Sequence, residues 1–324
     1  MYPIKFKPHY VEKVWGGRNL SSIGKDLPKG NIGESWEISC RKDVDSIISN
    51  GKYKGKTLGF LLSERGKAIV GNEIEPQNFP LLIKFLDAQK ELSIQVHPDD
   101  EYGKKEGDLG KTEAWIVLEA NKEANMVLGV KDCTKKVFYK GIQENNLEPY
   151  LNRIPIKKGD VFFIKSGLIH TMEGAVVAEI QQNSDLTYRV YDFNRGRELH
   201  IDKAMDVIDF SLKGKKASGL TAKEEGYEKT YYCYNDKFSI EKYEIKDMLK
   251  EKSDEERFYV YMCIEGSGKI IYEGGEENIS KGETILIPAS LGEYEFKGDL
   301  TLIKTYVPNI EKLEKEILKE VNYL

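Results

Sequence analysis

The sequence predicts a mainly β protein made of two β-rich halves, with short helical inserts and a helix at the C-terminal end. Short apolar runs rich in Val, Ile, Phe and Tyr recur between Gly, Pro and Asn/Asp residues, a pattern typical of strands joined by turns. Few intervals are long enough for crossover helices, so an antiparallel barrel or sandwich is favoured over an alternating α/β fold. One turn–strand–turn segment also occurs once in each half.

The first half carries seven apolar runs that we predict as strands, several of them with alternating apolar and polar residues. They are Ser35–Cys40, Leu92–His97, Thr112–Glu119, Asn125–Val130, Gly159–Lys165, Ala175–Gln181 and Leu186–Asp192.

Helical spacing of apolar residues is confined to two inserts in this half. The first insert is Leu58–Val70. The second is Thr134–Leu151, which opens with a capping residue at Thr134 and is weakened near its end by Pro149.

A segment rich in Lys, Gly and Ser, Ser211–Thr230, predicts a linker or a long surface loop between the halves. The tail, Pro308–Leu324, repeats apolar residues at helical spacing with Lys and Glu opposite, and predicts a packed terminal helix. We therefore expect two domains, residues 1–235 and 236–324. The strands expected after the linker are Ser239–Ile245, Arg257–Ile264, Lys269–Glu273, Glu283–Pro288, Glu293–Phe296 and Leu300–Val307.

An internal repeat relates the two halves. Lys158-Gly159-Asp160 and Lys281-Gly282-Glu283 each precede a four-residue strand and a second turn, at an offset of 123 residues (158 to 281). The first copy ends in His170, where the second has Glu293. We expect two copies of one architecture, of which the first binds metal. The second is expected to be structural, covering the first barrel or one side of its pocket.

The first copy, Gly159-x5-Lys165-x-Gly167-xx-His170, resembles the second motif of the cupin superfamily, with Lys165 in place of the usual Pro. The second copy, Gly282-x5-Pro288, keeps the Pro and lacks the later Gly and His. Cupins are small jelly-roll barrels that hold a metal inside. The resemblance therefore implies two cupin-like jelly-roll barrels, with a metal in the first alone.

The amino-acid composition limits the kinds of metal site and the classes of partner that this protein can have. The 324 residues include four histidines and four cysteines, so carboxylates or amides must complete any transition-metal site. The net charge of −5 argues against nucleic acid as a partner. No apolar run approaches a membrane span, and the N-terminus does not resemble a signal peptide. Because the cysteines are scattered without a CxxC motif, we expect free thiols and a cytoplasmic location.

Two segments carry polar residues on one face of a predicted strand. Ser93, Gln95 and His97 alternate along the first. This face is either a metal-binding interior, since amide oxygen and imidazole nitrogen both bind divalent metals, or a solvated outer face. Lys111 and Glu113 share a face of the second segment, as a surface salt bridge or, if turned inward, as an anionic ligand beside a positive charge.

A third segment follows His170 and combines acids with arginines. Glu179, Asp185, Arg189 and Arg195 lie within it. Arginine is suited to bidentate phosphate recognition, so the segment predicts acid–base and anion-binding groups. The simpler interpretation is a hairpin with a charged turn.

Together the three segments resemble the type I mannose-6-phosphate isomerases, a zinc-dependent branch of the cupins, over nearly the whole chain. The resemblance implies one Zn²⁺ per chain, a sugar-phosphate substrate and a catalytic arginine at Arg189. It also implies that Ser93 and Arg195 contact phosphate. The larger relatives read Val-Arg-Ala-Gly where this chain has Tyr188-Arg189-Val190-Tyr191. The metal ligands that it implies are Gln95, His97, Glu113 and His170.

The implied reaction interconverts mannose 6-phosphate and fructose 6-phosphate by moving a proton between C1 and C2 through a cis-enediol. Such a reaction needs a base near pH 7, a group that stabilises the oxyanion, and a clamp for the phosphate. Arg189 is expected to stabilise the enediolate, while Lys111, Glu179 and Asp185 remain alternatives for the base. Imidazole ligands favour zinc over calcium, with iron and manganese as alternatives.

Two other functions remain open. A cupin oxygenase would use non-haem iron held by two histidines and a carboxylate, and would need no anion clamp. A sugar-binding cupin without catalysis is the non-enzymatic alternative, and another aldose phosphate is an alternative substrate. His9 is expected to be structural or exposed, and His200 to lie on the surface or at the pocket rim.

Overall fold

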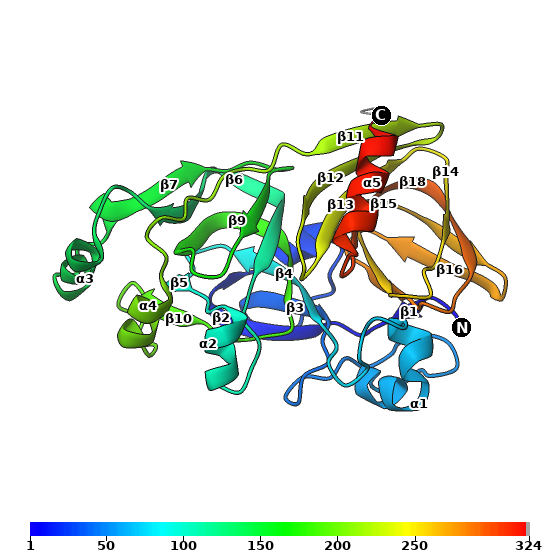
Figure 1. Ribbon diagram of the computed structural model, residues 1–324, viewed down its shortest axis with the longest axis horizontal. Coiled ribbons are helices and arrows are strands. Elements are labelled where there is room, and N and C mark those ends of the chain that lie inside the picture. The colour runs from blue at the N-terminus through cyan, green and yellow to red at the C-terminus, as the bar shows by residue number, and fades with distance from the viewer. Residues whose placement is uncertain (322–324) are drawn as a thin grey trace.

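Two nine-stranded sheets, packed against each other, form most of the protein (Figure 1). The structure is a computed structural model that describes residues 1–321. All strand pairs within these sheets are antiparallel. The predicted mainly β fold is therefore confirmed. No helix among residues 1–321 is long and apolar enough to cross a membrane.

The first sheet has the strand order β10-β5-β9-β4-β3-β2, and β6 joins it to β7 and β8 by pairing with β9. The runs Thr112–Glu119 and Asn125–Val130, predicted as two strands, form the single strand β6. The strand bounds are β2 (His9–Gly17), β3 (Ile32–Ile38), β4 (Leu81–Ala88), β5 (Ile94–Val96), β6 (Glu113–Val130), β7 (Leu151–Pro155), β8 (Val161–Ile164), β9 (His170–Gln182) and β10 (Tyr188–Tyr191).

The second sheet has the order β1-β17-β15-β18-β13-β12-β11, with β14 on β18 and β16 on β15. Its first strand comes from the N-terminus of the chain. Two pairs of predicted strands again merge, into β15 and β18. The bounds are β1 (Ile4–Lys5), β11 (Leu220–Glu224), β12 (Tyr227–Tyr234), β13 (Ser239–Ile245), β14 (Met248–Lys252), β15 (Tyr259–Tyr272), β16 (Gly275–Ser280), β17 (Thr284–Ile287) and β18 (Glu293–Thr305).

The predicted linker Ser211–Thr230 is only partly a loop, because β11 and the start of β12 lie within it. β11 is an edge strand with Ala222 as its one buried residue. An edge strand with so little apolar surface leaves almost no alternating pattern in the sequence. Since β11 and β12 pair into the second sheet, we propose that the domain boundary lies between residues 208 and 219 rather than at 235.

Strand register confirms the shared architecture of the two halves. In the first sheet Lys84, Glu179, Trp115 and Phe162 are partners in one row across β4, β9, β6 and β8. In the second sheet the corresponding row crosses β13, β18, β15 and β17. Phe162 and Ile285 end these rows at the offset of the sequence repeat. The residues of the second row are Glu241, Lys304, Tyr261 and Ile285.

The helices lie outside the sheets. α1 (Leu58–Val70) has the predicted bounds. α3 (Lys135–Gln143) is capped by Thr134 as predicted, but it ends eight residues before Leu151. Asn145 adopts a left-handed conformation (φ 52°) that a helix does not continue through. The segment then forms η2 (Glu148–Tyr150) and β7.

The C-terminal tail forms α5 (Ile310–Glu320), capped by Asn309. The predicted helix extended to Leu324, which lies outside the described residues. Leu313 and Ile317 pack on Tyr231 of the second sheet, as expected of a packed terminal helix. The remaining helices are η1 (Asn19–Ile23), α2 (Asp100–Lys105) and α4 (Ile201–Val207).

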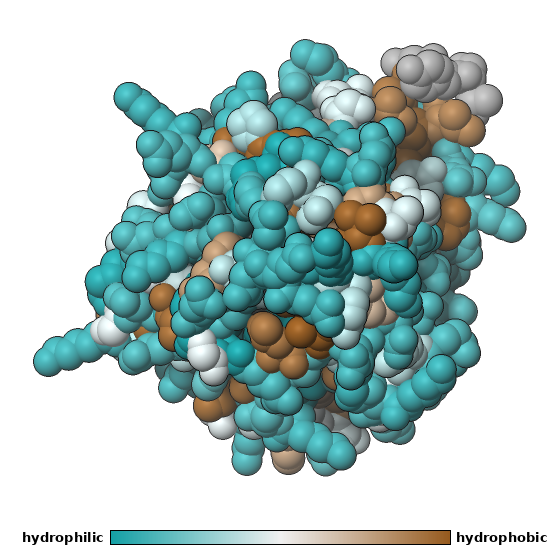
Figure 2. All heavy atoms as spheres, turned by 90° about the vertical axis from the view of Figure 1, so that its left-hand side faces the viewer, coloured by the Kyte–Doolittle hydropathy of each residue, from teal (hydrophilic) through white to brown (hydrophobic). Residues whose placement is uncertain are grey.

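One apolar cluster contains side chains from both sheets. Phe79 and Phe258, for example, stack with ring centroids 4.9 Å apart, and Ile83 and Ile303 belong to the same cluster. The second half therefore packs on the first. Figure 2 shows that the face formed by the first half is mostly hydrophilic, with small scattered hydrophobic patches.

Candidate metal centre and substrate cavity

Three predicted ligands meet inside the first barrel. His97 follows β5, Glu113 begins β6 and His170 begins β9. One nitrogen or oxygen atom from each lies within 4.8 Å of the others, and all three side chains are buried. The register of the sheet creates this arrangement, because Gln95 of β5 is the direct partner of His170.

Backbone carbonyls orient both imidazole rings. His97 Nδ1 lies 2.8 Å from the carbonyl oxygen of Leu186, and His170 Nδ1 lies 2.9 Å from that of Leu168. A carbonyl oxygen only accepts, so each Nδ1 carries the proton and donates it. The Nε2 atoms face Glu113, whose carboxylate oxygens lie 3.6 Å from Nε2 of His97 and 3.2 Å from Nε2 of His170. Metal-binding histidines are commonly oriented in this way.

Several polar atoms at this point lack hydrogen bonds. His97 Nε2 and both carboxylate oxygens of Glu113 are buried without a hydrogen-bond partner. Burial lowers the pKa of His97 to about 3, with Lys111 acting in the same direction, so the ring is neutral. Burial alone would raise the pKa of Glu113, but Lys111 at 3.0 Å helps to hold it well below the usual range.

The arrangement thus presents two imidazole Nε2 atoms and one carboxylate at one point. Buried polar atoms without hydrogen bonds are costly, and a divalent transition metal would satisfy them. The donor set therefore fits a metal ion. Gln95 lies beside it, with Nε2 3.2 Å from His170 Nε2, while its Oε1 accepts a hydrogen bond from Ser93 at 3.2 Å.

A cavity of about 400 Å³ adjoins the group. Its lining side chains carry six basic groups (Lys13, Lys84, Lys111, Arg189, Arg197 and Lys203) and four carboxylates (Glu34, Glu106, Glu179 and Asp185), a formal excess of two positive charges. Ser93, Gln95 and His200 also line it, so His200 lies at the pocket as one of its two expected positions. All lining residues lie between 13 and 203, so of the two expected positions of the second half, against the first barrel or along one side of its pocket, the structure supports the first.

A buried polar group forms the floor of this cavity. Glu179 accepts a hydrogen bond from Trp115 Nε1 at 2.8 Å and lies 3.4 Å from Lys84 Nζ. Burial raises the pKa of Glu179 above its usual value, although Lys111 and Lys84 oppose the shift. Lys84 also lies 3.6 Å from Glu34 and 4.6 Å from the centroid of the Trp36 ring.

Sequence reasoning missed Lys84 and Glu34. Lys84 stands alone as a charged residue in the apolar run Pro80–Leu86. A single lysine within a strand that is buried on both faces is unusual, since buried lysines need a partner. This single lysine in an apolar run was the signal in the sequence. Both the strand and a buried ion pair could have been predicted from it.

Two arginines lie at the cavity wall. Arg189 Nε is buried without a hydrogen-bond partner, while Nη1 donates to the backbone oxygen of Glu198 at 3.4 Å. Burial lowers the pKa of Arg189, and nearby Arg197 lowers it further. Two neighbouring cations repel each other unless an anion lies between them. Asp185 lies across the cavity with 52% of its side chain exposed, 4.0 Å from Lys84.

Arg195, expected to bind phosphate, does not line the cavity. Its guanidinium donates to the backbone oxygens of Asp192 and Glu91, at 3.0 and 2.6 Å, and to the Asp192 carboxylate at 2.8 Å. These three hydrogen bonds hold it on the neighbouring loop, and its role in binding phosphate stays a prediction. Arg197, two residues later, pairs with the same carboxylate and lines the cavity.

Comparison with known proteins gives the same architecture. Residues 4–142 match the family of the phosphomannose isomerase type I catalytic domain, and residues 227–307 match the mannose-6-phosphate isomerase cupin domain. The chain is 37% identical to YvyI of Bacillus subtilis (strain 168) over 94% of this chain and 99% of that protein. It is 34% identical to the mannose-6-phosphate isomerase ManA of the same organism, over 91% of this chain and 96% of ManA.

A solved structure agrees. The crystal structure of the mannose 6-phosphate isomerase from Bacillus subtilis superposes with a TM-score of 0.88 at 36% identity, covering 94% of this chain and 99% of that one. Matches in sequence and structure thus span both sheets. The chain belongs to the type I phosphomannose isomerase family.

Proposed function

We propose that this protein is a mannose-6-phosphate isomerase that interconverts mannose 6-phosphate and fructose 6-phosphate, with one Zn²⁺ per chain. The observation that carries the proposal is the buried group of His97, Glu113 and His170, which has polar atoms without hydrogen bonds. Gln95 and Lys111, which contact this group, line the positively charged cavity beside it. The names of the relatives point to the same reaction.

The donor set supports zinc. Two imidazoles and one carboxylate match the ligands that zinc prefers, whereas calcium and magnesium prefer oxygen alone. Gln95 is the proposed fourth ligand, because it lies beside His170. When bound, the metal would act as a Lewis acid toward a sugar oxygen at C1 or C2.

We assign the proton transfer to Glu179. Lys111 forms an ion pair with Glu113 at 3.0 Å, so we assign it the role of a cation rather than of a base. Asp185 is half exposed to water. Glu179 is buried at the cavity floor, and one of its oxygens is held by Trp115. A buried carboxylate whose pKa is raised toward neutrality is a stronger base than an exposed one.

The arginines are proposed to bind the anionic parts of the substrate. Arg189 lines the cavity and its Nε lacks a hydrogen-bond partner, which supports a role in stabilising the negative charge of the enediolate. Arg197, in place of Arg195, is proposed to bind the phosphate, together with Ser93. The excess of two positive charges in the lining suits a phosphate dianion. We expect the enzyme to act in the cytoplasm, where its four free cysteines stay reduced.

The test is a direct assay of the metal-analysed protein with mannose 6-phosphate and other aldose phosphates. Fructose 6-phosphate formed from mannose 6-phosphate at equal rates with and without oxygen is the expected result. Oxygen-dependent turnover with bound iron would support a cupin oxygenase instead. Two substitutions test which carboxylate acts as the base. Glu179→Gln is expected to lower kcat at least about a hundredfold, and Asp185→Asn is expected to lower it much less.

A further inference from the structure

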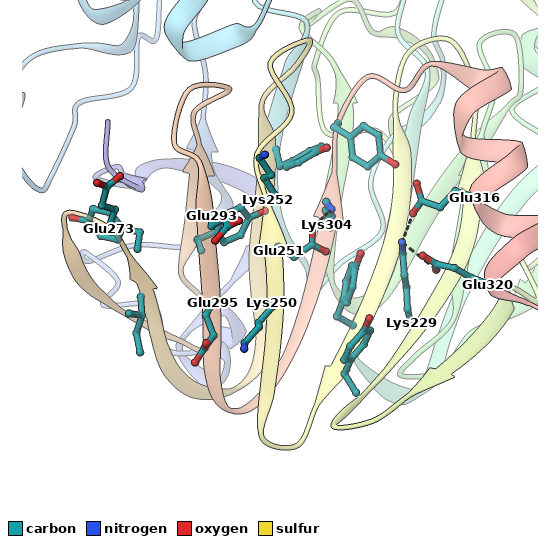
Figure 3. Close-up of a pocket in the computed structure, with 17 residues that line it drawn as sticks. Lys229, Lys250, Glu251, Lys252, Glu273, Glu293, Glu295, Lys304, Glu316 and Glu320 are labelled. Atoms are coloured by element: carbon teal, nitrogen blue, oxygen red, sulfur yellow. Dashed lines mark hydrogen bonds and ion pairs between the residues drawn. The ribbon is translucent and has the colours of Figure 1, made fainter.

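The second barrel contains a larger cavity, which the proposed isomerase reaction does not use. Its volume is about 1020 Å³, against about 400 Å³ for the cavity of the first half. It is lined by residues of strands β12 to β15 and β18, of the turn after β15, and of α5 (Figure 3). The volume exceeds that required for a single sugar ring.

The cavity floor occupies the position that the catalytic cavity occupies in the first half. Lys304 of β18 is the register equivalent of Glu179, and its partner Glu241 on β13 is the equivalent of Lys84. Both halves thus place a lysine and a glutamate side by side in the same row, with the two charges exchanged. An aromatic residue follows in each row, Tyr261 in place of Trp115.

The two lysines of this floor are buried and paired with carboxylates. Lys304 is 6% exposed, and its Nζ lies 3.0 Å from Glu251 Oε2. Burial alone would lower the pKa of Lys304, but Glu251 and Glu241 raise it, so the ammonium stays charged. Lys229 Nζ lies 2.6 Å from the carboxylate of Glu316 and 3.5 Å from that of Glu320. Figure 3 shows these two glutamates on α5, pointing toward Lys229.

Tyrosines form the remaining walls. Lys304 lies 4.1 Å from the centroid of the Tyr259 ring, and Tyr306 donates a hydrogen bond to Glu241 at 2.6 Å. Tyr294 also lines the cavity, and its hydroxyl pairs with that of Tyr261 at 2.9 Å. The walls thus offer ring faces beside hydroxyls, carboxylates and ammonium groups.

A barrel that served packing alone would gain from an apolar interior. Burying paired charges usually costs as much as the pairs return, and well-packed apolar residues are often more stable. Here two lysines, Lys229 and Lys304, are buried beside an open volume of ligand size, and their carboxylate partners Glu251, Glu316 and Glu320 line the same volume. A cavity with a few converging polar groups is the usual form of a small-molecule site.

The charge of the lining selects the class of ligand. Four lysines against six glutamates leave a formal excess of two negative charges, the opposite of the catalytic cavity. This excess repels a sugar phosphate. Hydroxyl groups of a sugar exchange hydrogen bonds with both carboxylates and ammonium groups, and the C–H face of a pyranose packs on an aromatic ring.

We propose that the C-terminal barrel binds an uncharged saccharide of about disaccharide size. This site is separate from the catalytic cavity and does not depend on the metal. It extends the purely structural role that the sequence predicted for the second half.

The experiment is isothermal titration calorimetry of the full chain with maltose, cellobiose and mannobiose, in the presence of saturating mannose 6-phosphate. At least one disaccharide is expected to bind with a 1:1 ratio, unaffected by mannose 6-phosphate. Tyr259→Ala is expected to weaken that binding at least about tenfold, whereas Tyr234→Ala, an exposed tyrosine outside the cavity, leaves it unchanged. Glu251→Gln, which keeps the shape of the cavity, is the second variant should Tyr259→Ala unfold.

Three results would overturn the proposal. They are no binding of any of the three disaccharides up to about 10 mM, displacement by mannose 6-phosphate, and binding of spermidine in place of a saccharide. Isomerase activity of the two cavity variants is measured in parallel and is expected to equal that of the wild type. The outcome of the titration is thus independent of the isomerase assignment.

Discussion

The ion pair beneath the catalytic cavity gives a quantitative prediction for Glu34→Gln. Glu34 is buried, with its carboxylate 3.0 Å from Lys13, 3.6 Å from Lys84 and 2.6 Å from Trp36 Nε1. Burial opposes ionisation, but Lys84 and Lys13 lower the pKa of Glu34 from 4.5 to about 2. At about 1.4 kcal/mol per pKa unit, this shift corresponds to about 3 kcal/mol of folding free energy.

The direction of the pH dependence follows from the sign of the shift. The pKa is lower in the folded state, so the stabilisation is complete above the unfolded-state value of 4.5 and is lost as the pH falls toward 2. About 3 kcal/mol is expected at pH 7 and about half of that at pH 3. Glu34→Gln, which cannot ionise, is therefore expected to be most destabilising at neutral pH.

Thermal unfolding followed by tryptophan fluorescence measures this difference. All three tryptophans, Trp15, Trp36 and Trp115, lie in strands of the first sheet, so the signal reports on the catalytic half. At pH 7, Glu34→Gln is expected to lower Tm by about 6–12 °C. The matched control is Glu101→Gln, whose exposed carboxylate pairs with Lys104 and is expected to contribute little at any pH. A Tm difference that stays constant from pH 7 to pH 3 would refute the reasoning.

Two further predictions concern the cavity. Arg197→Lys is expected to raise KM for mannose 6-phosphate about tenfold, because Arg197 lines the cavity. Arg195→Lys is the matched control, since Arg195 pairs with the same Asp192, and it is expected to change KM by less than about twofold. Steady-state kinetics measure both values, and equal effects of the two substitutions would contradict the assignment. Trp115→Phe removes the N–H that binds Glu179, a hydrogen bond to a charged group that is expected to contribute about 2 kcal/mol. A lower Tm together with a lower kcat is expected, and an unchanged kcat would exclude a role for this bond in positioning Glu179.

The sequence predicted those strands and helices that depend on residues close together in the chain. The period-two pattern around Gln95 and His97, and the capping residue of α3, both depend on near neighbours in the chain. The merging of two predicted strands into β6 could not be predicted this way, because β9 pairs with β6 on both sides of the intervening polar residues. Edge strand β11 left no pattern, since it buries one residue.

In the candidate site, too, some residues could be predicted from local sequence patterns and others could not. The metal ligands came from the family resemblance together with alternation along strands, and the structure places His97, Glu113 and His170 together. Whether Arg195 or Arg197 faces the cavity depends on how one loop turns. Asn194 adopts a left-handed conformation there (φ 57°), a choice that spacing in the sequence does not reveal. The floor containing Lys84 depends on the register of four strands, which only the folded sheet defines.

Metal content and isomerase activity, measured together on one set of proteins, test the central claim most directly. Wild type, His170→Ala and the control His9→Ala, whose ring lies outside the cavity, are stripped with a chelator, incubated with zinc, and then analysed for bound metal and for conversion of mannose 6-phosphate. Wild type and His9→Ala are expected to bind one Zn²⁺ per chain and to regain activity. His170→Ala is expected to do neither while keeping its fold. Full activity of His170→Ala, or of the wild type without metal, would contradict the proposed metal centre.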